Sequence, residues 1–391
     1  MHHLLVTNDF PPRRGGIQSY LFELWRRLPP GSATVLTRDR PGAAEWDAGQ
    51  TLPVVRARDP ALLPRPGLRR RIDRLAAQVG AELVMFDPVF PLGLLGPRLA
   101  LPYGLVLHGG EMTMPAQVPG VRGALARVLR GARIVVACGG YVAEEARRVG
   151  GAGLPIVEIP PAVDAARFRP LSAVEREQAR RRFGLPVQGR LVLSVGRLVP
   201  RKGMDVLIRA AARVREGRPD LCVAIAGGGR DRARLSLLDR RLGRPVRLLG
   251  PVADDRLGSL YGCADLFALL CRDRWGGLAE GYGVVFLEAA AAGLPQLAGA
   301  SGGSARAVLD DVTGCLVDDA RSVEAVAAQL ARLLDDAPLR ARLGMAARAR
   351  ILGSLSADAL AARLDEALLR VMGGAPRGRA APPAAREHAA S

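Results

Sequence analysis

Residues 191–203 read Leu-Val-Leu-Ser-Val-Gly-Arg-Leu-Val-Pro-Arg-Lys-Gly, and the architecture of the chain can be worked out from this stretch. The β-rich apolar run Leu191–Val195 predicts a buried strand. Gly196 and Arg197 follow it directly, and Lys202 comes a few residues later. A strand that ends in a glycine turn beside fixed cations is typical of a site that binds an anion.

Lys202 is the only lysine among the 56 basic residues; the others are arginine. Arginine serves wherever only positive charge is needed. A retained lysine therefore indicates a site that excludes the broad guanidinium and accepts a compact ammonium, for instance against one phosphate oxygen. The alternative is a lysine that survives by chance on a solvated turn.

Short apolar runs alternate with helical patterns along the whole chain, which is typical of parallel sheets covered by helices. A proline-containing segment, residues 160–170, interrupts this series and indicates a connector. We therefore predict an α/β fold of two facing, doubly wound domains with the active site in the cleft between them. The expected parts are a first domain over 1–165, a second over 166–355, a helix over 356–372 that packs back toward the first domain, and a disordered tail over 373–391. Strands are expected at 3–7, 33–37, 83–86, 104–108, 134–138, 156–159, 191–195, 222–226, 246–249, 266–269, 296–298 and 315–317, and helices at 121–133, 322–335 and 356–372.

Length and composition agree with two globular domains. The 391 residues are too many for one compact core, and 49% of them are apolar, with a mean hydropathy of +0.11. No stretch reaches the roughly 18 to 20 uninterrupted apolar residues of a membrane span. The N-terminus runs straight into a strand-like segment without a signal peptide, so we expect a cytoplasmic protein.

The cysteines are few, scattered and without a Cys-x-x-Cys pair. Most lie in apolar runs, so we expect small core residues in a reducing compartment, not disulfides or a zinc site. They are Cys138, Cys222, Cys263, Cys271 and Cys315.

The net charge of +18 raises the question of a nucleic-acid partner. The arginines are spread along the whole chain, aromatic residues make up only 4%, and no nucleic-acid-binding motif appears. We therefore expect no nucleic-acid partner. Arginine clusters of this kind indicate a solvated face or one that meets anionic lipid.

The strongest motif pairs Glu280 with Glu288, eight residues apart, and places a Gly-x-Gly turn directly after the first. From Val284 the sequence predicts a buried helix that ends at Gly293. The turn would let backbone N–H groups at the helix start approach a diphosphate. The turn and helix start comprise Gly281, Tyr282, Gly283 and Val284. The alternative is an ordinary helix start with an acidic flank.

His108 is the one plausible catalytic histidine, because the other three lie at the chain ends. It follows an apolar strand and precedes Gly109 and Gly110, which predicts a place at the catalytic edge of the first sheet. A structural histidine that caps the next loop is the alternative.

With these motifs in hand, the chain resembles a retaining glycosyltransferase of sequence family 4, with the GT-B arrangement of two facing Rossmann-like domains, from Leu4 to about Met372. Further matching pieces are 9–16, 163–170, 227–229, 292–295 and 301–303. Residues 7–20 are most similar to actinobacterial phosphatidylinositol mannoside mannosyltransferases, which use GDP-mannose. After Gly303 the family usually continues with Pro-Glu, whereas this chain has Ala305 and Arg306.

The resemblance implies a role for each matching residue. Gly16 would close over the donor diphosphate, Arg197 and Lys202 would neutralise it, and the 281–284 turn would meet it with backbone N–H groups. The donor sugar would contact Glu280, the ribose Glu288, and the base the backbone around Val252. On the acceptor side would stand Asn8, Asp9 and His108.

The resemblance thus predicts transfer of a hexose, most simply mannose from GDP-mannose, onto a phosphatidylinositol mannoside or related glycolipid. No convincing carboxylate nucleophile or metal motif appears. We therefore expect same-face attack without a required metal, with Arg197 and Lys202 stabilising the leaving diphosphate. Alternatives are a UDP-sugar enzyme acting on a soluble or polymeric sugar, a nucleotide-sugar epimerase, and a noncatalytic anion- or lipid-binding protein.

A basic cluster in the first domain is a candidate membrane surface. If the acceptor is an anionic phospholipid, a basic and partly apolar patch should dock on the inner leaflet as a peripheral contact. A solvated helix in an arginine-rich protein is the alternative. The cluster comprises Arg65, Arg69, Arg70, Arg71 and Arg74, interspersed with Leu62, Leu63, Leu68, Ile72 and Leu75.

Overall fold

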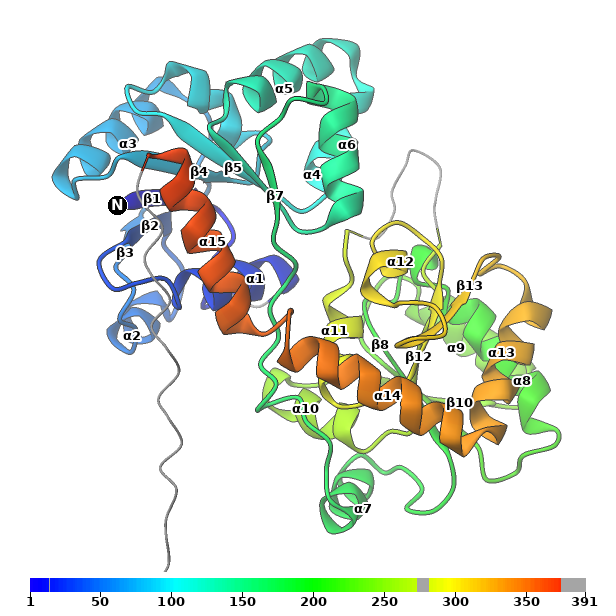
Figure 1. The fold of residues 1–391 in the computed structure, drawn as a ribbon. Helices are drawn as coiled ribbons and strands as arrows, with labels where there is room; N and C mark the ends of the chain where they lie inside the picture. The colour runs from blue at the N-terminus through cyan, green and yellow to red at the C-terminus, as the bar shows by residue number, and fades with distance from the viewer. Residues whose placement is uncertain (14, 273–280, 374–391) are drawn as a thin grey trace, which may run out of the picture.

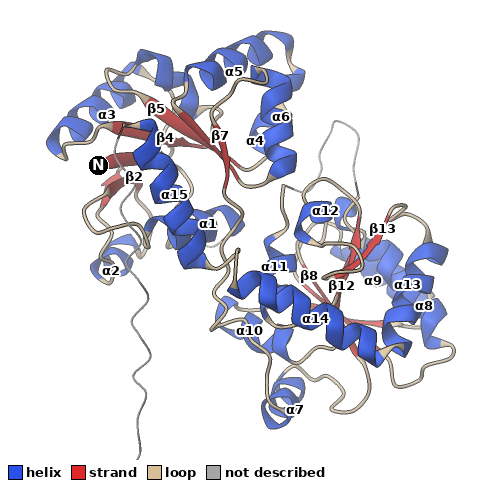
Figure 2. Ribbon diagram, viewed as in Figure 1, coloured by secondary structure: helices blue, strands red, loops and turns tan. Residues whose placement is uncertain are grey.

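The structure is a computed structural model that describes residues 1–13, 15–272 and 281–373. The chain forms two lobes, each built on one parallel sheet flanked by helices (Figures 1 and 2). Of the expected tail, all but Gly373 lies outside the described residues.

The first lobe contains a seven-stranded sheet in the order β3-β2-β1-β4-β5-β6-β7, in which every pairing is parallel. Its strands are β1 His3–Thr7, β2 Ala33–Arg38, β3 Val54–Ala57, β4 Leu83–Asp87, β5 Tyr103–Leu107, β6 Ile134–Ala137 and β7 Ile156–Glu158. Its helices are α1 Gly16–Trp25, α2 Ala43–Ala48, α3 Pro66–Gln78, α4 Gly110–Thr113, α5 Pro119–Gly131 and α6 Gly140–Gly150, with the 3-10 helices η1 Leu92–Arg98 and η2 Pro115–Gln117.

The second lobe contains a six-stranded parallel sheet in the order β10-β9-β8-β11-β12-β13. Its strands are β8 Leu191–Val195, β9 Cys222–Ala226, β10 Val246–Gly250, β11 Leu266–Leu269, β12 Gln296–Gly299 and β13 Gly314–Val317. Its helices are α7 Ala173–Arg182, η3 Pro200–Lys202, α8 Met204–Arg215, α9 Arg232–Arg241, α10 Asp254–Gly262, α11 Val284–Ala291, α12 Ser304–Ala307, α13 Val323–Asp335 and α14 Ala337–Leu352. The last helix of the chain is α15 Ala357–Val371.

The central strands of both sheets are buried along their full length, including every residue of β1 and of β8. A parallel strand covered on both faces needs apolar side chains on both, which explains the uninterrupted apolar runs in the sequence. Each buried Leu or Val contributes about 1.5 to 3 kcal/mol relative to exposure. The strands thus fix the layers of the fold.

The strand orders predict where a ligand binds. In each sheet the chain moves outward from the first strand in one direction and then returns to start again on its other side, between β1 and β4 and between β8 and β11. Such reversals leave a crevice at the carboxyl ends of the strands. Residues that follow β1, β4, β8 and β11 are therefore placed for function.

The strand β3 and the helix α14 are two of the elements that were not among the expected ones. The strand β3 is a short edge strand with only Ala57 fully buried, so its apolar signal is weak. The helix α14 buries a narrow stripe of Leu339, Leu343, Ala347 and Ile351 amid arginines, and the arginines hide its periodicity. Both are elements whose burial depends on neighbours distant in sequence.

The C-terminal helix crosses from the second lobe to the first. The helix α15 begins at the N-cap Ser356, whose hydroxyl accepts a hydrogen bond from the Ala359 N–H at 3.3 Å. It packs against α1 (Figure 1), and Asp358 accepts a hydrogen bond from the Arg27 Nε at 3.0 Å. The two lobes are thus joined both by the connector and by this helix.

All five cysteines are buried and hold free thiols, as the sequence predicted for small core residues. In the described part of the chain, no helix combines the length and apolar character that crossing a bilayer requires.

Candidate functional site

The two lobes meet where their glycine-rich turns face each other. A side chain at Gly281 would collide with the carbonyl oxygen of His108, and a Cβ at Gly16 would lie 3.9 Å from the Val284 side chain. A Cβ at Gly109 would lie 3.7 Å from the Gly281 Cα. Predicted donor and acceptor residues from opposite lobes therefore converge at one place.

On the first lobe this place is centred on a buried Asp–His pair. Asp87, at the end of β4, is fully buried, and its Oδ1 lies 2.6 Å from the His108 Nε2. Its Oδ2 accepts a hydrogen bond from the Thr7 hydroxyl at 2.6 Å. Sequence reasoning missed Asp87, although a carboxylate at the end of a strand beside β1 was a usable signal. The pair fixes the orientation of the imidazole.

The Asp87 carboxylate also controls the charge of His108. Burial alone would lower the pKa of His108, but the adjacent carboxylate outweighs this effect and holds the pKa well above its usual value. The ring packs edge-on against Tyr20 at 5.2 Å between centroids. Glu111 accepts a hydrogen bond from the His108 backbone N–H at 2.6 Å. The Asp87 carboxylate therefore favours the protonated form of His108, and the Glu111 hydrogen bond holds the start of the next loop.

Asp9 lies beside this pair and is held by the first helix. Its carboxylate accepts hydrogen bonds from Gln18 at 2.6 Å and from Arg13 at 2.9 Å. Burial, followed by the negative charge of Asp87, raises its pKa. The first lobe thus places two interacting carboxylates and one histidine at the end of its sheet, where the glycine turns of the two lobes meet.

The other predicted acceptor residue, Asn8, is already engaged. Its amide nitrogen donates to the Leu62 carbonyl at 3.0 Å, and its amide oxygen accepts from the Leu62 N–H at 2.8 Å. This pair of bonds ties the end of β1 to the loop that precedes α3.

On the second lobe, the turn after β8 is packed against the glycine-rich loop after β9. A side chain at Gly227 would collide with the Gly196 carbonyl, and one at Gly229 would collide with that of Leu198. Both glycines have positive φ, at 140° and 156°, which favours glycine. These contacts pack the loop of residues 227–229 against the turn that carries the predicted anion site.

Within this turn the two predicted cations differ in exposure. Lys202 is 6% exposed, and its Cε lies 4.0 Å from where a Cβ of Gly196 would be. Arg197 is exposed. The turn is held from below by Arg272, whose Nε donates to the Pro200 carbonyl at 3.0 Å and whose guanidinium pairs with Asp205 at 2.9 Å. The ammonium thus sits in a tight turn, whereas the guanidinium is at the surface.

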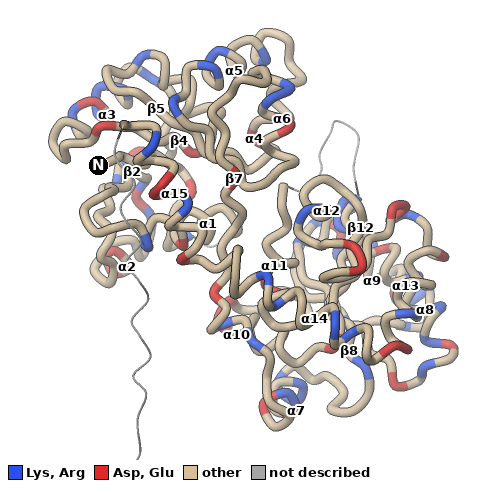
Figure 3. Tube along the Cα trace, viewed as in Figure 1, with Lys and Arg blue, Asp and Glu red and all other residues tan. Residues whose placement is uncertain are grey.

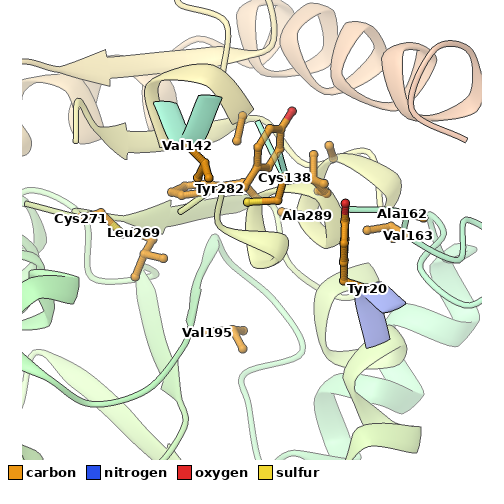
Figure 4. Close-up of a cluster of buried hydrophobic side chains, with 14 of the residues drawn as sticks. Tyr20, Cys138, Val142, Ala162, Val163, Val195, Leu269, Cys271, Tyr282 and Ala289 are labelled. Atoms are coloured by element: carbon orange, nitrogen blue, oxygen red, sulfur yellow. The ribbon is translucent and has the colours of Figure 1, made fainter. Parts of the chain in front are cut away.

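The helix start that follows Gly281 has the predicted form. Gly283 precedes α11 with a φ of 86°, which favours glycine. Tyr282 is buried and projects toward the first lobe beside Cys138 and Val142 (Figure 4). A Cβ at Gly139 would lie 2.9 Å from the Tyr282 Cε2, so the ring occupies space that this glycine leaves open.

Glu288 projects from α11 and is partly buried. Its Oε2 accepts a hydrogen bond from the Tyr261 hydroxyl at 2.7 Å. Burial raises the pKa of Glu288, and the Tyr261 hydrogen bond opposes this shift. Val252 lies in the loop after β10. The end of β10 is joined to the 227–229 loop by a hydrogen bond of 2.8 Å, which the Gly227 N–H donates to the Gly250 carbonyl. Glu280, the first glutamate of the motif, lies outside the described residues.

The charge reversal at Arg306 has a structural explanation. Arg306 belongs to α12 and pairs with Glu144 of α6, on the other lobe, at 2.8 Å. The Arg350 guanidinium donates to its backbone carbonyl at 3.2 Å. Arg306 therefore forms a contact between the lobes, a role that the sequence did not predict.

The basic cluster differs from the expectation in one respect. Leu62, Leu68 and Ile72 are buried against the sheet and give the surface no apolar area. Leu63 is 51% exposed. The predicted partly apolar patch is therefore wrong for these three side chains, because the apolar stripe of α3 is used by the core.

The arginines of the cluster are partly compensated by acidic neighbours. Arg65 and Arg71 pair with Asp59, and Arg69 pairs with Asp73 at 3.4 Å. Basic and acidic residues alternate over both lobes (Figure 3). Among the described residues, no group of three or more His, Cys, Asp or Glu side chains is placed to hold a metal ion.

Two facing Rossmann-like domains, each built on a parallel sheet and with glycine-rich turns that meet between them, have the arrangement of the GT-B class of glycosyltransferases. The family model for glycosyltransferase family 4 matches residues 14–167, and that for glycosyl transferases group 1 matches residues 175–350. The chain therefore belongs to the glycosyltransferases that combine these two domains, and it is a hexosyltransferase that uses a nucleotide-sugar donor.

The relatives and solved structures agree with this assignment. A GDP-mannose-dependent alpha-(1-6)-phosphatidylinositol monomannoside mannosyltransferase of Mycobacterium tuberculosis is 39% identical over 93% of this chain and 97% of its own length. A monoacylated-acceptor enzyme of the same kind from Corynebacterium glutamicum is 32% identical, with the same shares covered. The structure of Anabaena HepE in complex with UDP and glucose matches 95% of this chain and 100% of its own, with a TM-score of 0.78 and 19% identity. This match confirms the GT-B fold.

Proposed function

We propose that this protein transfers mannose from GDP-mannose to a phosphatidylinositol mannoside or a closely related glycolipid. The observation that carries the proposal is the near full-length similarity to enzymes named for this donor and acceptor. The convergence of both lobes on one cleft supports it, because donor and acceptor must meet there.

The second lobe binds the donor. Lys202 and Arg197 neutralise the diphosphate, while the backbone N–H groups at residues 281–284 and Gly16 close around it. Glu280 binds the sugar hydroxyls, Glu288 binds the ribose, and the Val252 loop meets the base. The tight turn around Lys202 supports an ammonium that contacts a single phosphate oxygen.

The first lobe binds the acceptor. Asp9 and His108 face the incoming hydroxyl, and Asp87 orients His108. Asn8 acts on the acceptor side by holding the Leu62 loop. A protonated His108 suits an acceptor that carries a phosphate, because its positive charge complements the anion.

Transfer proceeds with retention through attack on the face that the diphosphate leaves. The bond between the anomeric carbon and the diphosphate oxygen breaks as the acceptor oxygen bonds to the same carbon. The acceptor proton passes to the departing diphosphate oxygen. Arg197, Lys202 and the backbone N–H groups stabilise the charge that grows on that oxygen. No metal is required in this scheme.

The enzyme works at the cytoplasmic face of the membrane, where the arginine cluster on α3 contacts anionic headgroups. Because three of its leucine and isoleucine side chains are buried, the contact is chiefly electrostatic and peripheral.

Product analysis tests this proposal. The purified protein is incubated with radiolabelled GDP-mannose, UDP-glucose or UDP-N-acetylglucosamine, each with a lipid extract or a soluble glycan mixture. We expect label from GDP-mannose alone, in a glycolipid that mild alkali deacylates to a water-soluble headgroup carrying an α-linked mannose. Transfer of label from a UDP-sugar to a soluble glycan would show that the proposed donor and acceptor are wrong. Release of a free epimerised sugar would indicate an epimerase.

A variant at Glu280 tests the role of the sugar contact. Glu280→Gln keeps the shape and removes the charge, so we expect a loss mainly in kcat. A variant with unchanged kcat would remove Glu280 from the proposed donor site.

A further inference from the structure

The Glu288 carboxylate is held by a buried phenol on a neighbouring helix. Tyr261 of α10 is fully buried, and its hydroxyl donates to the Glu288 Oε2 at 2.7 Å. Burial raises the pKa of this phenol well above its usual value, so the hydroxyl keeps its proton and can act as a donor. The sequence motif drew attention to Glu288 and gave no sign of this partner.

The ring of Tyr261 is itself fixed on two sides by aromatic neighbours. Phe168 contacts it edge-on at 5.6 Å between centroids, and Phe267 contacts it at 5.7 Å. Phe267 in turn packs against Phe286 of α11, the helix that carries Glu288. Edge-on aromatic pairs of this kind contribute about 0.5 to 1.5 kcal/mol beyond the area they bury. The phenol therefore has little freedom to move.

Phe168 belongs to the connector between the lobes, and α10 is shaped to receive that connector. A side chain at Gly258 would collide with the Arg167 carbonyl, and a Cβ at Gly262 would lie 2.6 Å from the Leu171 Cγ. Arg167 also pairs with Asp254, at the start of α10, at 2.9 Å. The connector thus lies directly on the helix that holds Tyr261.

We propose that Tyr261 is a positioning residue that sets the rotation of the Glu288 carboxylate in the donor ribose subsite, and that Phe168 of the connector holds Tyr261 in place. The proposal rests on the proposed role of Glu288 toward the ribose. It deepens that role by linking the nucleotide subsite to the segment that joins the two lobes.

The chemistry of a vicinal diol explains why rotation matters. Two ribose hydroxyls reach one carboxylate only when its oxygens face both of them, and a carboxylate free to turn loses part of that binding as rotational entropy. The Tyr261 hydrogen bond uses one lone pair of Oε2 and leaves the remaining acceptor sites of the group for the ligand. Its loss should therefore weaken recognition of the hydroxyls and leave the chemistry at the sugar unchanged.

The hydrogen bond also helps keep Glu288 ionised. Burial raises the pKa of Glu288, whereas the Tyr261 hydroxyl and the charge of Arg167 lower it and Asp254 raises it. From α14, Arg348 bonds the Ala291 carbonyl at the end of the same helix. Without the hydroxyl the pKa of Glu288 should rise further, so nucleotide binding should fail at a higher pH than in the wild type.

The test is Tyr261→Phe, with Tyr103→Phe as the matched control. Tyr103 is also a buried tyrosine, and its hydroxyl donates to the Val128 carbonyl at 2.8 Å in the other lobe. Affinity is measured calorimetrically for GDP and for 2′,3′-dideoxy-GDP. We expect Tyr261→Phe to weaken GDP about fivefold to tenfold, to leave dideoxy-GDP within twofold, and to leave kcat unchanged. Tyr103→Phe should leave both affinities as in the wild type.

Three results would overturn the proposal. Equal weakening of both nucleotides would indicate general damage to the lobe, and unchanged GDP affinity would show that the hydroxyl positions nothing. The third concerns pH: the proposal would be wrong if GDP binding by Tyr261→Phe is lost on acidification at the same pH as in the wild type.

Glu288→Gln separates failure of this proposal from failure of the ribose role. If Glu288→Gln leaves GDP affinity unchanged, the ribose role itself is wrong; if it weakens GDP while Tyr261→Phe does not, only the positioning role is wrong. Should GDP not bind the wild type, UDP and 2′,3′-dideoxy-UDP serve as probes.

The link to the connector is tested with Phe168→Leu, alone and combined with Tyr261→Phe. We expect Phe168→Leu to weaken GDP about twofold to threefold and to add nothing once the hydroxyl is gone. Additive effects would show that Phe168 does not act through Tyr261.

Discussion

The two sheet ends that face each other across the cleft are chemically unlike. The first lobe presents the ionisable side chains Asp87, His108 and Asp9. Burial lowers the pKa of His108 but the Asp87 carboxylate outweighs this and raises it, and burial together with the charge of Asp87 raises the pKa of Asp9. The second presents glycine turns and one buried ammonium, Lys202. The first lobe should therefore respond to pH through His108 and Asp9, whereas in the second lobe burial raises the pKa of Glu288.

The largest effect should follow from the second lobe. Lys202→Ala should lower kcat/KM by about two orders of magnitude, as expected for loss of a buried phosphate contact worth roughly 3 kcal/mol. Lys202→Arg should also be impaired, because the guanidinium does not fit beside Gly196. Steady-state kinetics with the labelled donor measure both. Arg209→Ala, on the exposed face of α8, serves as the control. Wild-type kinetics in the Lys202→Arg variant would show that the site accepts a guanidinium and would contradict the inference drawn from the single lysine.

On the first lobe, Asp87→Asn should lower kcat/KM by about tenfold, less than Lys202→Ala, because Asp87 acts through His108. The raised pKa of His108 stabilises the fold while the ring is protonated. This contribution is complete below about pH 6.5 and is lost as the pH rises through the folded-state pKa. The difference in Tm between wild type and variant should therefore shrink toward alkaline pH. A difference that grows with pH would contradict the assigned sign.

A buried histidine away from the cleft adds an opposite response to acid. Burial lowers the pKa of His3 to about 3, and its Nε2 accepts a hydrogen bond from the Trp25 indole at 2.9 Å. The neutral His3 ring contributes fully to the free energy of unfolding above the unfolded-state pKa of about 6.5. Below that pH, about 1.4 kcal/mol of this free energy is lost for each pH unit. His3→Gln, which keeps an acceptor for Trp25, should flatten the fall of Tm between pH 6 and 4. The neighbouring His2→Gln should retain it, and equal slopes in all three proteins would contradict the prediction.

The smallest effect concerns the surface of the first lobe. Replacing Arg69, Arg70 and Arg71 by serine should weaken binding to anionic vesicles by about 1 kcal/mol for each arginine near the bilayer, and salt should reduce the difference. Removing the same charge from the exposed Arg209, Arg240 and Arg241 of the second lobe is the control. Because Leu62, Leu68 and Ile72 are buried, little binding should survive high salt. Binding that ignores lipid charge would leave α3 without a membrane role.

Much of the fold could be predicted because its information is local. Buried parallel strands need continuous apolar runs, and these appeared at β1, β8, β9 and β11 with nearly their observed bounds. The edge strand β3 and the helix α14 were missed because their burial depends on packing partners elsewhere in the chain. The place of Asp87 at the end of β4 could have marked it as a candidate, but only the folded structure shows that its partner is a histidine on the next strand.

By itself, the sequence determined the fold class, because apolar strand runs and glycine turns depend on residues at adjacent positions; the class of enzyme came from the resemblance of its motifs to a known family. Only the tertiary structure decided which side chains act together. It joined Asp87 to His108, Tyr261 to Glu288 and Arg306 to Glu144, and it turned the apolar stripe of α3 inward. Hydrogen bonds, pKa shifts and burial depend on distances between atoms remote in sequence, and the folded chain fixes those distances.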